Sequence, residues 1–311
     1  MTSSAAAIVN PAAGTRRRRL APSVVAERLR ACGLEPEILL TRHAGHASDL
    51  ARAAAERHPL VVAVGGDGTL HEVARGLVGT GATLAVVPVG SGNDFAAALG
   101  AGNPEAAWRV VAAGVGRDLD VGYFGERPFF NSVGLFVSGL VSWRAARLRR
   151  PFGPARYMAA ALATLIRARP TAAVWQLDRK RWREDAYLLA EICNGPRTGG
   201  TFYLMPEADP FDGLLGLCLV RPLGLAAALR LLPAVTAGRT VDHPAVERLH
   251  LREGNLVITR DTWVHVDGEP GPLAAGIHSV RLRAGALRVL ATSGFPRPEA
   301  SGSGVGPGGS R

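Results

Sequence analysis

Short apolar runs alternate with amphipathic stretches along the first hundred residues. The runs cover residues 5–9, 37–41, 59–64 and 83–87, which predicts buried strands. The stretches between them predict helices over residues 16–32, 47–57, 70–77 and 93–99. Strands that alternate with helices indicate an α/β class with a parallel, doubly wound sheet. In such sheets ligands bind at the carboxyl ends of the strands. The residues that follow the predicted strands, and are therefore candidates for binding, are Asn10, Thr41, residues 66–69 and Ser91.

The pattern changes at about residue 120. Strand-like runs now follow one another, at residues 118–123, 127–137, 172–177, 182–194, 214–220, 255–266, 280–283 and 286–291. Helical patterns interrupt them at 157–167 and 225–237. We therefore expect an α/β domain over residues 1–120 and a β-rich, sandwich-like domain over residues 121–291. The Gly-, Ser- and Pro-rich tail, residues 292–311, is expected to be disordered.

Composition favours a cytoplasmic protein with a sizeable core. The chain has 311 residues, of which 47% are apolar, and only three cysteines, none in C-x-x-C spacing. Neither a disulfide framework nor a zinc knuckle is therefore expected. The amino-terminal residues show no signal-peptide pattern, and no apolar run is long enough to predict a membrane-spanning helix.

The net charge of +10 comes almost entirely from arginine. One interpretation is biased composition with a solvated surface, and the other is attraction to anionic lipids or nucleotides. Residues 144–150 are an arginine-rich candidate for membrane contact, whereas no basic-aromatic pattern supports nucleic-acid binding. Lys180 is the only lysine and lies outside any G-x-x-x-x-G-K-[ST] motif, so phosphate binding would rest on backbone N–H groups, metal and arginine.

The segment 61–73 reads V-V-A-V-G-G-D-G-T-L-H-E-V, a buried strand followed by a glycine turn and a helix start. Glycines 65, 66 and 68 allow close backbone approach to a ligand, and a helix amino terminus favours negative charge. Asp67 lies within this anion cradle. A carboxylate beside phosphates indicates a hard cation such as Mg²⁺ between them.

This segment resembles the GGDGT signature of the diacylglycerol kinase catalytic domain, whose superfamily includes sphingosine, ceramide and NAD kinases. Three further motifs are similar to that family in the same order. They are N-P-A-A-G at 10–14, P-V-G-S-G-N-D-F-A at 88–96 and D-G-E at 267–269. The second is typical of the lipid-kinase branch. In that family the end of the chain returns to the first domain, so residues 287–291 are expected to do so here.

The resemblance implies an ATP site and two catalytic acids. The implied nucleotide contacts are Asn10, Pro11, Ala12, Ala13, Gly14, Thr41, Gly65, Gly66, Asp67, Gly68, Thr69, Leu70, His71, Glu72 and Ser91. His71 departs from the asparagine of many relatives, which leaves its nucleotide contact open. Asp67 is the implied Mg²⁺ ligand. Glu269 is the implied proton acceptor for the substrate hydroxyl and Asp267 its orienting neighbour, although the sequence does not separate these roles.

A second metal site is an open alternative. Residues 209–215 are similar to a turn that, in some bacterial members, holds a structural Mg²⁺ through one Asp side chain and main-chain oxygens. The ligands here would be Asp212 with backbone oxygens of Asp209 and Leu214. A plain Asp-Gly hairpin turn is the other interpretation.

The motifs together predict an ATP- and Mg²⁺-dependent lipid kinase of the diacylglycerol kinase type. We expect it in the cytoplasm, in peripheral contact with anionic membranes, either as a monomer or as a homodimer. The alternatives are a sphingoid-base or NAD kinase of the same superfamily, and a nucleotide-binding regulator without catalysis. The acceptor lipid depends on pocket shape, which the sequence does not give.

Overall fold

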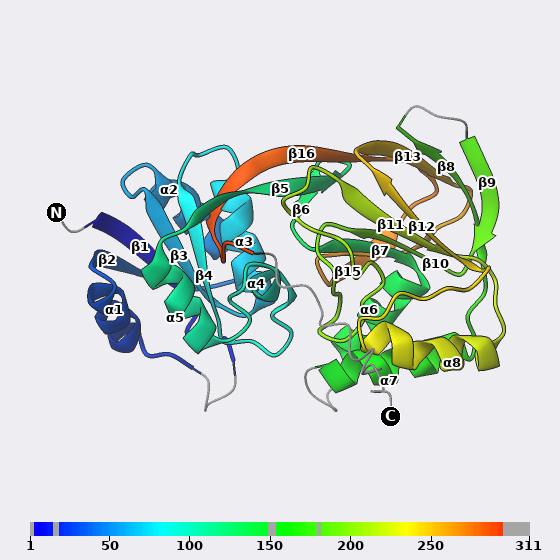
Figure 1. Cartoon of the computed structure of the whole chain (residues 1–311), viewed down its shortest axis with the longest axis horizontal. Helices are drawn as coiled ribbons and strands as arrows, with labels where there is room; N and C mark the ends of the chain where they lie inside the picture. The colour runs from blue at the N-terminus through cyan, green and yellow to red at the C-terminus, as the bar shows by residue number, and fades with distance from the viewer. Residues whose placement is uncertain (1–2, 15–18, 149–153, 179–181, 295–311) are drawn as a thin grey trace, which may run out of the picture.

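The computed structural model describes residues 3–14, 19–148, 154–178 and 182–294. The arginine-rich segment 144–150 is described only as far as Leu148, and the predicted disordered tail lies almost wholly outside the described residues. Figure 1 shows two lobes side by side, with two long strands crossing from one to the other. The first lobe is the expected parallel-sheet domain, and the second is an antiparallel sandwich.

Four parallel strands form the centre of the first domain, in the order β2-β1-β3-β4. They are β1 (Ser3–Val9), β2 (Leu34–Leu40), β3 (Leu60–Gly65) and β4 (Thr83–Pro88). Main-chain bonds tie the loops that leave them, because Asn10 N donates to Val64 O at 3.0 Å and Val89 N to Gly65 O at 2.8 Å. The candidate loops therefore meet at one edge of the sheet.

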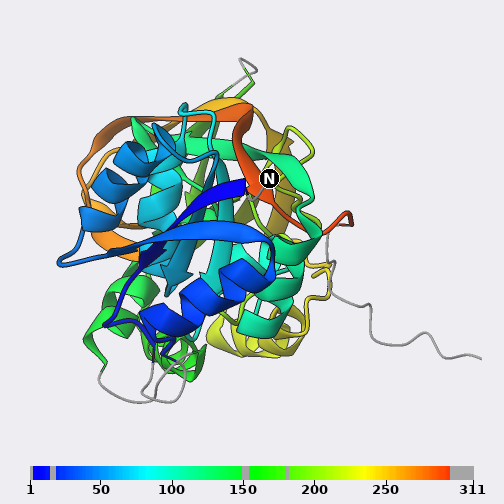
Figure 2. The ribbon, with the colours of Figure 1, turned by 90° about the vertical axis from the view of Figure 1, so that its left-hand side faces the viewer.

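Helices cover both faces of this sheet (Figure 2). They are α1 (Pro22–Ala31), α2 (His46–Ala55), α3 (Asp67–Leu77), α4 (Asp94–Ala98) and α5 (Pro104–Ala113). Their apolar faces pack with the Val-rich strands into one core that includes Ile8, Val62 and Leu70, all fully buried. A sheet covered on both faces explains why its strands are almost continuously apolar.

Two strands carry the chain between the domains. They are β5 (Gly116–Phe124) and the 15-residue β16 (Gly276–Leu290), which pair antiparallel. Val289 of β16 also pairs in parallel with Leu84 of β4, so the end of the chain lies in the first domain's sheet. The register shifts between Arg283 and Leu287, where Gly285 has a φ of +60°. Asp120 accepts the N–H of Gly285 at 2.8 Å and holds this bulge.

The second domain packs two antiparallel sheets around a separate core that contains Phe129, Leu135, Trp175 and Ile192. One sheet adds β13 (Glu253–Ile258), β8 (Thr171–Leu177) and β9 (Trp182–Tyr187) beyond β16, while β6 (Arg127–Phe129) pairs with β5. The other has the order β12 (Val246–Leu251), β11 (Leu215–Val220), β10 (Leu189–Cys193), β7 (Ser132–Phe136), β14 (Thr262–Val266) and β15 (Glu269–Leu273).

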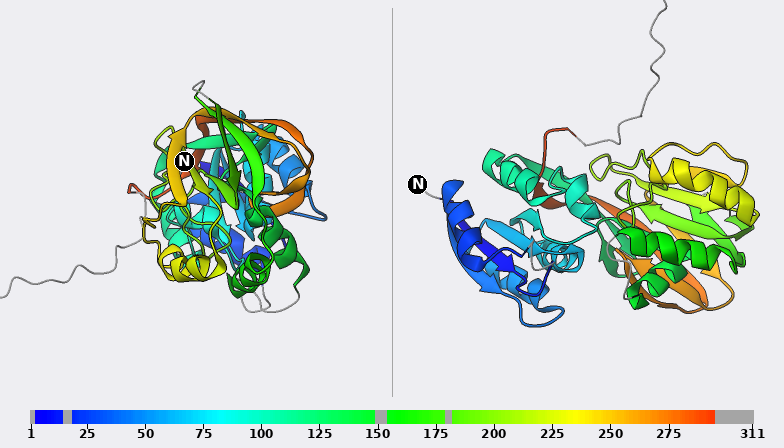
Figure 3. Two further views of the ribbon diagram at one scale, coloured as in Figure 1. Left: turned by 90° about the vertical axis from the view of Figure 1, so that its right-hand side faces the viewer. Right: turned by 90° about the horizontal axis from the view of Figure 1, so that it is seen from below.

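Three helices lie along one side of this second domain (Figure 3). They are α6 (Val137–Arg147), α7 (Pro154–Leu165) and α8 (Leu225–Thr236). Arg144 ties α6 to α7 by donating to the carbonyl oxygen of Ala163 at 2.8 Å. No helix in the described part of the chain is long and apolar enough to cross a membrane.

Three predicted strands prove to be two elements each. The run 182–194 divides into β9 and β10, and 255–266 into β13 and β14, with the two parts of each run in different sheets. The run 127–137 divides into β6 and β7. Conversely, the two predicted late strands join into β16.

Candidate active site

The first part of the site is a cavity of about 520 Å³ at the carboxyl edge of the parallel sheet, which we call the loop cavity. It gathers ten of the predicted nucleotide contacts: Asn10, Pro11, Ala12, Ala13, Gly14, Thr41, Gly66, Gly68, Thr69 and Glu72. Asn10 Nδ2 donates to Thr69 Oγ1 at 2.9 Å, and Asn10 Oδ1 accepts the N–H of Ala12 at 2.9 Å. One side chain therefore fixes the first loop against the start of α3.

Glycine is required where the loops of this cavity touch. A Cβ on Gly14 would lie 2.6 Å from the carbonyl oxygen of Val89, and the φ of Gly14 is +76°. A Cβ on Gly90 would lie 3.0 Å from the Cα of Gly66. The absence of side chains at these positions allows the loops after β1, β3 and β4 to lie in contact with one another.

The second part is a cavity of about 110 Å³ between the domains, which we call the inter-domain cavity. Its polar lining includes Asp67, His71, Ser91, Asp94, Asn131, His265 and Asp267. Asp67 Oδ2 accepts the N–H of Asn93 at 2.9 Å, whereas Asp67 Oδ1 is buried without a hydrogen-bond partner. The start of α3 thus separates the two cavities, with Gly66 and Gly68 toward one and Asp67 toward the other.

Asp267 and Gly268 form the two-residue turn of the β14–β15 hairpin, in which Val266 pairs with Glu269. Both turn residues have positive φ, +50° and +81°, as a type I′ turn requires. The carboxylate of Asp267 accepts three backbone N–H groups, from Phe130 at 3.0 Å, Asn131 at 2.8 Å and Ser132 at 3.1 Å. It therefore fastens the turn to the segment that precedes β7.

Glu269 occupies a different environment from Asp267. Its side chain is 46% exposed and pairs with Arg75 of α3 at 3.5 Å and with Arg127 of β6. It does not line the inter-domain cavity. Glu269 forms an ionic bridge between the domains, and its role as proton acceptor stays a prediction.

A buried polar cluster lies beneath the Asp267 turn. Glu191 of β10 and His265 of β14 flank Gly134 of β7, and Ser138 of α6 donates to Glu191 Oε2 at 2.6 Å. His265 Nε2 lies 3.3 Å from Glu191 Oε1, and His265 Nδ1 accepts the N–H of Gly268 at 3.3 Å. Burial alone would raise the pKa of Glu191, but His265 and Ser138 outweigh it and lower that pKa. Through the hydrogen bond from Gly268 to His265, this cluster fixes the position of the turn formed by Asp267 and Gly268.

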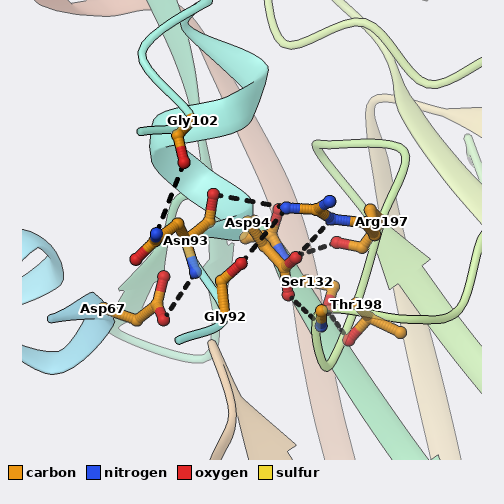
Figure 4. Close-up of polar contacts among 10 residues, drawn as sticks. Asp67, Gly92, Asn93, Asp94, Gly102, Ser132, Arg197 and Thr198 are labelled. Atoms are coloured by element: carbon orange, nitrogen blue, oxygen red, sulfur yellow. Dashed lines mark hydrogen bonds and ion pairs between the residues drawn. The ribbon is translucent and has the colours of Figure 1, made fainter. Parts of the chain in front are cut away.

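An ion pair joins the domains at the same cavity (Figure 4). Arg197, after β10, contacts Asp94 at 2.6 Å and donates to the carbonyl oxygen of Gly92 at 3.2 Å. Asp94 also accepts the N–H of Gly200 at 2.8 Å. Burial raises the pKa of Asp94 to about 6, even though Arg197 opposes the shift. The sequence motif at 88–96 contains Asp94, but nothing in the sequence indicates its partner Arg197.

The raised pKa of Asp94 predicts a pH-dependent loss of stability. Between about pH 4 and 6 an unfolded chain releases this proton while the folded protein keeps it, so this contribution is present at low pH and lost as pH rises. A rise of the pKa from 3.8 to about 6 corresponds to a loss of folding stability on the order of 3 kcal/mol at most. Between pH 4 and pH 7, the free energy of unfolding measured with denaturant should fall by up to this amount more in wild type than in Asp94→Asn. Parallel pH dependence in the two proteins would refute the shift.

The turn at residues 209–214 lies apart from both cavities. Asp212 N donates to the backbone oxygen of Asp209 at 3.3 Å, and Asp212 Oδ1 accepts the N–H of Leu214 at 2.9 Å. Asp120 accepts the N–H of Gly213 at 2.7 Å and ties the turn to β5. Among the described residues, no group of three or more His, Cys, Asp or Glu side chains is arranged to hold a metal ion. A site built mainly from backbone oxygens stays a prediction.

Several predicted nucleotide contacts lie away from the loop cavity. Leu70 is fully buried in the core, and a Cβ on Gly65 would lie 2.5 Å from Thr69, so both residues are closely packed and their nucleotide contacts stay a prediction. Asp67, His71 and Ser91 line the inter-domain cavity. Glu72 does line the loop cavity, and its Oε2 accepts the N–H of Ala47 at 3.3 Å, at the start of α2.

Both domains match known families. Residues 4–124 match the diacylglycerol kinase catalytic domain, and residues 131–291 match the YegS C-terminal NAD kinase beta sandwich-like domain. The chain belongs to the diacylglycerol kinase family. A family member named diacylglycerol kinase, from Mycobacterium tuberculosis, is 32% identical over 70% of each chain. A relative named probable lipid kinase YegS-like, from Pseudomonas fluorescens, is 33% identical over 85% of this chain and 88% of its own.

Solved structures extend the family likeness to the whole fold. A diacylglycerol kinase from Bacillus anthracis has a TM-score of 0.74 at 20% identity, covering 94% of this chain and 98% of its own. An NAD kinase from Archaeoglobus fulgidus in complex with ATP has a TM-score of 0.52 at 13% identity, covering 93% and 94%. At these identities the likeness shows a shared fold, and the diacylglycerol kinase family in general implies use of ATP.

Proposed function

We propose that this protein is an ATP- and Mg²⁺-dependent lipid kinase that phosphorylates the hydroxyl of a lipid alcohol such as diacylglycerol. One observation carries the proposal: the glycine-rich start of α3 stands between two cavities. Phosphoryl transfer requires a donor phosphate on one side of the reacting centre and an acceptor hydroxyl in line on the other. Residues 1–120 would then serve as the nucleotide domain and 121–291 as the acceptor domain.

ATP fits the loop cavity by its chemistry. Backbone N–H groups around Gly66 and Gly68, at the amino terminus of the 11-residue α3, suit phosphate oxygens. Glycines at 14 and 90 let the loops around the cavity pack closely, because a Cβ at either position would meet the backbone of a neighbouring loop. Asn10 and Thr69 are already joined and would hold the phosphate loop in shape.

Magnesium fits beside Asp67. The unpartnered, buried Asp67 Oδ1 offers an oxygen ligand, and a Cβ on Gly92 would lie only 2.8 Å from Asp67 Oδ2. Mg²⁺ bound there would neutralise charge on the transferring phosphoryl group. Asp67 would position it and Asn93 N–H would orient the carboxylate.

The two acids of the β14–β15 turn have separate roles in the proposal. Asp267 lines the acceptor side and fixes residues 130–132 there. Glu269 would act as proton acceptor only after it releases Arg75 and Arg127. Phosphoryl transfer depends mainly on positioning and charge neutralisation, so a strong base is not a requirement.

A lipid acceptor is supported by an apolar cavity of about 140 Å³ beneath α8. Its lining is almost wholly apolar, with Val141, Leu165, Leu188, Leu231 and Val235 among its residues. Ser138, Val141, Thr198 and Phe202 line both this cavity and the inter-domain cavity. An acyl chain in the apolar cavity would leave its polar end in the inter-domain cavity, where transfer takes place.

Access to such a substrate requires contact with a membrane surface. With a net charge of +10, binding to vesicles should increase with their content of anionic lipid and weaken as salt screens the arginines. Co-sedimentation with phosphatidylcholine vesicles, with and without about a third phosphatidylglycerol, would measure this. Equal binding to both kinds of vesicle at low salt would refute the electrostatic contribution. Gel filtration in the same buffer would show whether a homodimer forms.

An acceptor panel tests the proposed function against its alternatives. Wild type is expected to release ADP from ATP in the presence of diacylglycerol in mixed micelles, and to release little with sphingosine or NAD. Turnover with NAD or sphingosine alone would favour the other kinases of the superfamily. ATP binding without turnover on any acceptor would favour a nucleotide-binding regulator.

A further inference from the structure

His71 is a buried side chain whose polar atoms have no partner. It lies one helical turn after Asp67 on α3 and is only 4% exposed. Both ring nitrogens are buried and neither makes a hydrogen bond within the protein. Such atoms are costly to leave unpaired, and where they line a cavity a water, an ion or a ligand can complete their bonding.

The imidazole is held in place by aromatic rings. It stacks on Phe130 at 6.2 Å between ring centroids with an interplanar angle of 16°, and it meets Phe95 at 5.6 Å. Phe95 and Phe130 are fully or almost fully buried themselves. These contacts fix the ring plane without using its nitrogens, so the polar edge stays available.

The position of His71 identifies what it can contact. It lines the inter-domain cavity and not the loop cavity, although its neighbours Thr69 and Glu72 line the latter. Three carboxylates, those of Asp67, Asp94 and Asp267, and one guanidinium, that of Arg156, line the same inter-domain cavity. The acidic groups outnumber the basic one, so the lining suits a neutral alcohol better than a phosphate that no metal ion accompanies. His265, which also lines it, is already bonded to Gly268 and lies against Ser138 and Glu191.

We propose that His71 binds the reacting hydroxyl of the acceptor alcohol through one of its unpaired ring nitrogens. A neutral imidazole offers one donor and one acceptor, and a hydroxyl offers the same pair. His71 then belongs to the acceptor half of the site rather than to the nucleotide half. This inference rests on the proposed function and adds a residue that orients the hydroxyl.

Two substitutions separate binding from packing. His71→Asn keeps a donor and an acceptor, and His71→Leu keeps the bulk but removes both. With diacylglycerol and ATP as substrates, the kcat/KM of the leucine variant for the lipid should be at least about tenfold lower than that of wild type. Its KM for ATP should stay within about twofold of wild type, and the asparagine variant should stay within about threefold on both substrates.

The Tm of the leucine variant distinguishes ligand binding from packing, because the two roles predict changes of opposite sign. Because His71→Leu removes two unpaired polar atoms from a buried position, its Tm should equal or exceed that of wild type. A fall in Tm would make His71 a packing residue and overturn the proposal. Unchanged lipid kinetics in the leucine variant, or a raised KM for ATP alone, would overturn it too. If wild type itself phosphorylates no lipid, the proposed function fails first and the inference fails with it.

Discussion

Replacing Asp67 with alanine should abolish phosphoryl transfer while the protein keeps its fold. The Asp67 side chain makes a hydrogen bond with the N–H of Asn93, and its buried Oδ1 has no partner within the protein. Loss of the metal-positioning oxygen should lower kcat by at least about 10³-fold, roughly 4 kcal/mol of barrier. Steady-state kinetics with ATP, Mg²⁺ and lipid would measure it, and circular dichroism would check the fold.

The matched control is Asp49→Ala, which removes an exposed acid from the first turn of α2. It should keep kcat within about twofold, because Asp49 lines neither cavity. A folded Asp67→Ala variant within about threefold of wild type, roughly 0.7 kcal/mol, would rule out the metal role.

The second large effect is expected at Asp267, and it should exceed that of Glu269. In Asp267→Asn an amide –NH₂ would face at least one of three backbone N–H donors, which places donor against donor. The segment around Asn131 would shift at the cavity wall, and we expect kcat to fall by about 10²–10³-fold, comparable to losing a positioned catalytic group. Glu269→Gln keeps the size of the side chain, so its loss should stay below about tenfold.

This order differs from the one that the sequence motif implies, in which Glu269 is the proton acceptor. Measuring kcat for both variants with one lipid decides between them. A larger loss in Glu269→Gln, at unchanged KM for ATP, would show that Glu269 leaves its arginines and reaches the hydroxyl. Similar small losses in both would place the essential chemistry elsewhere.

The first domain was predictable because each of its signals is local. Buried parallel strands are continuous apolar runs, and the glycine turns that end them stand out in the sequence. The second domain was less predictable. Residues 182–194 look like one long strand, yet Leu188 lies between β9 and β10, which belong to opposite sheets. Only packing of the sandwich decides where such a run breaks.

The site shows the same division between local and long-range information. Asn10, Thr41 and Gly66 meet because strand ends of a parallel sheet share one edge, which the pattern implies. The contact of Asp94 with Arg197 and the cluster of Glu191 with His265 join residues about 70 to 100 positions apart. Contacts between residues so far apart in the chain cannot be predicted from the spacing of residues within a motif. For the same reason the motif leaves the nucleotide contact of His71 open, and only the fold shows that His71 lines the inter-domain cavity.

The most direct test of the lipid-kinase proposal is transfer of labelled phosphate. Wild type incubated with [γ-³²P]ATP, Mg²⁺ and diacylglycerol in mixed micelles should yield labelled phosphatidic acid, and Asp67→Ala should yield none above background. Label that appears only in inorganic phosphate, or only in NADP when NAD is added to the same incubation, with the lipid unlabelled, would contradict the proposed function.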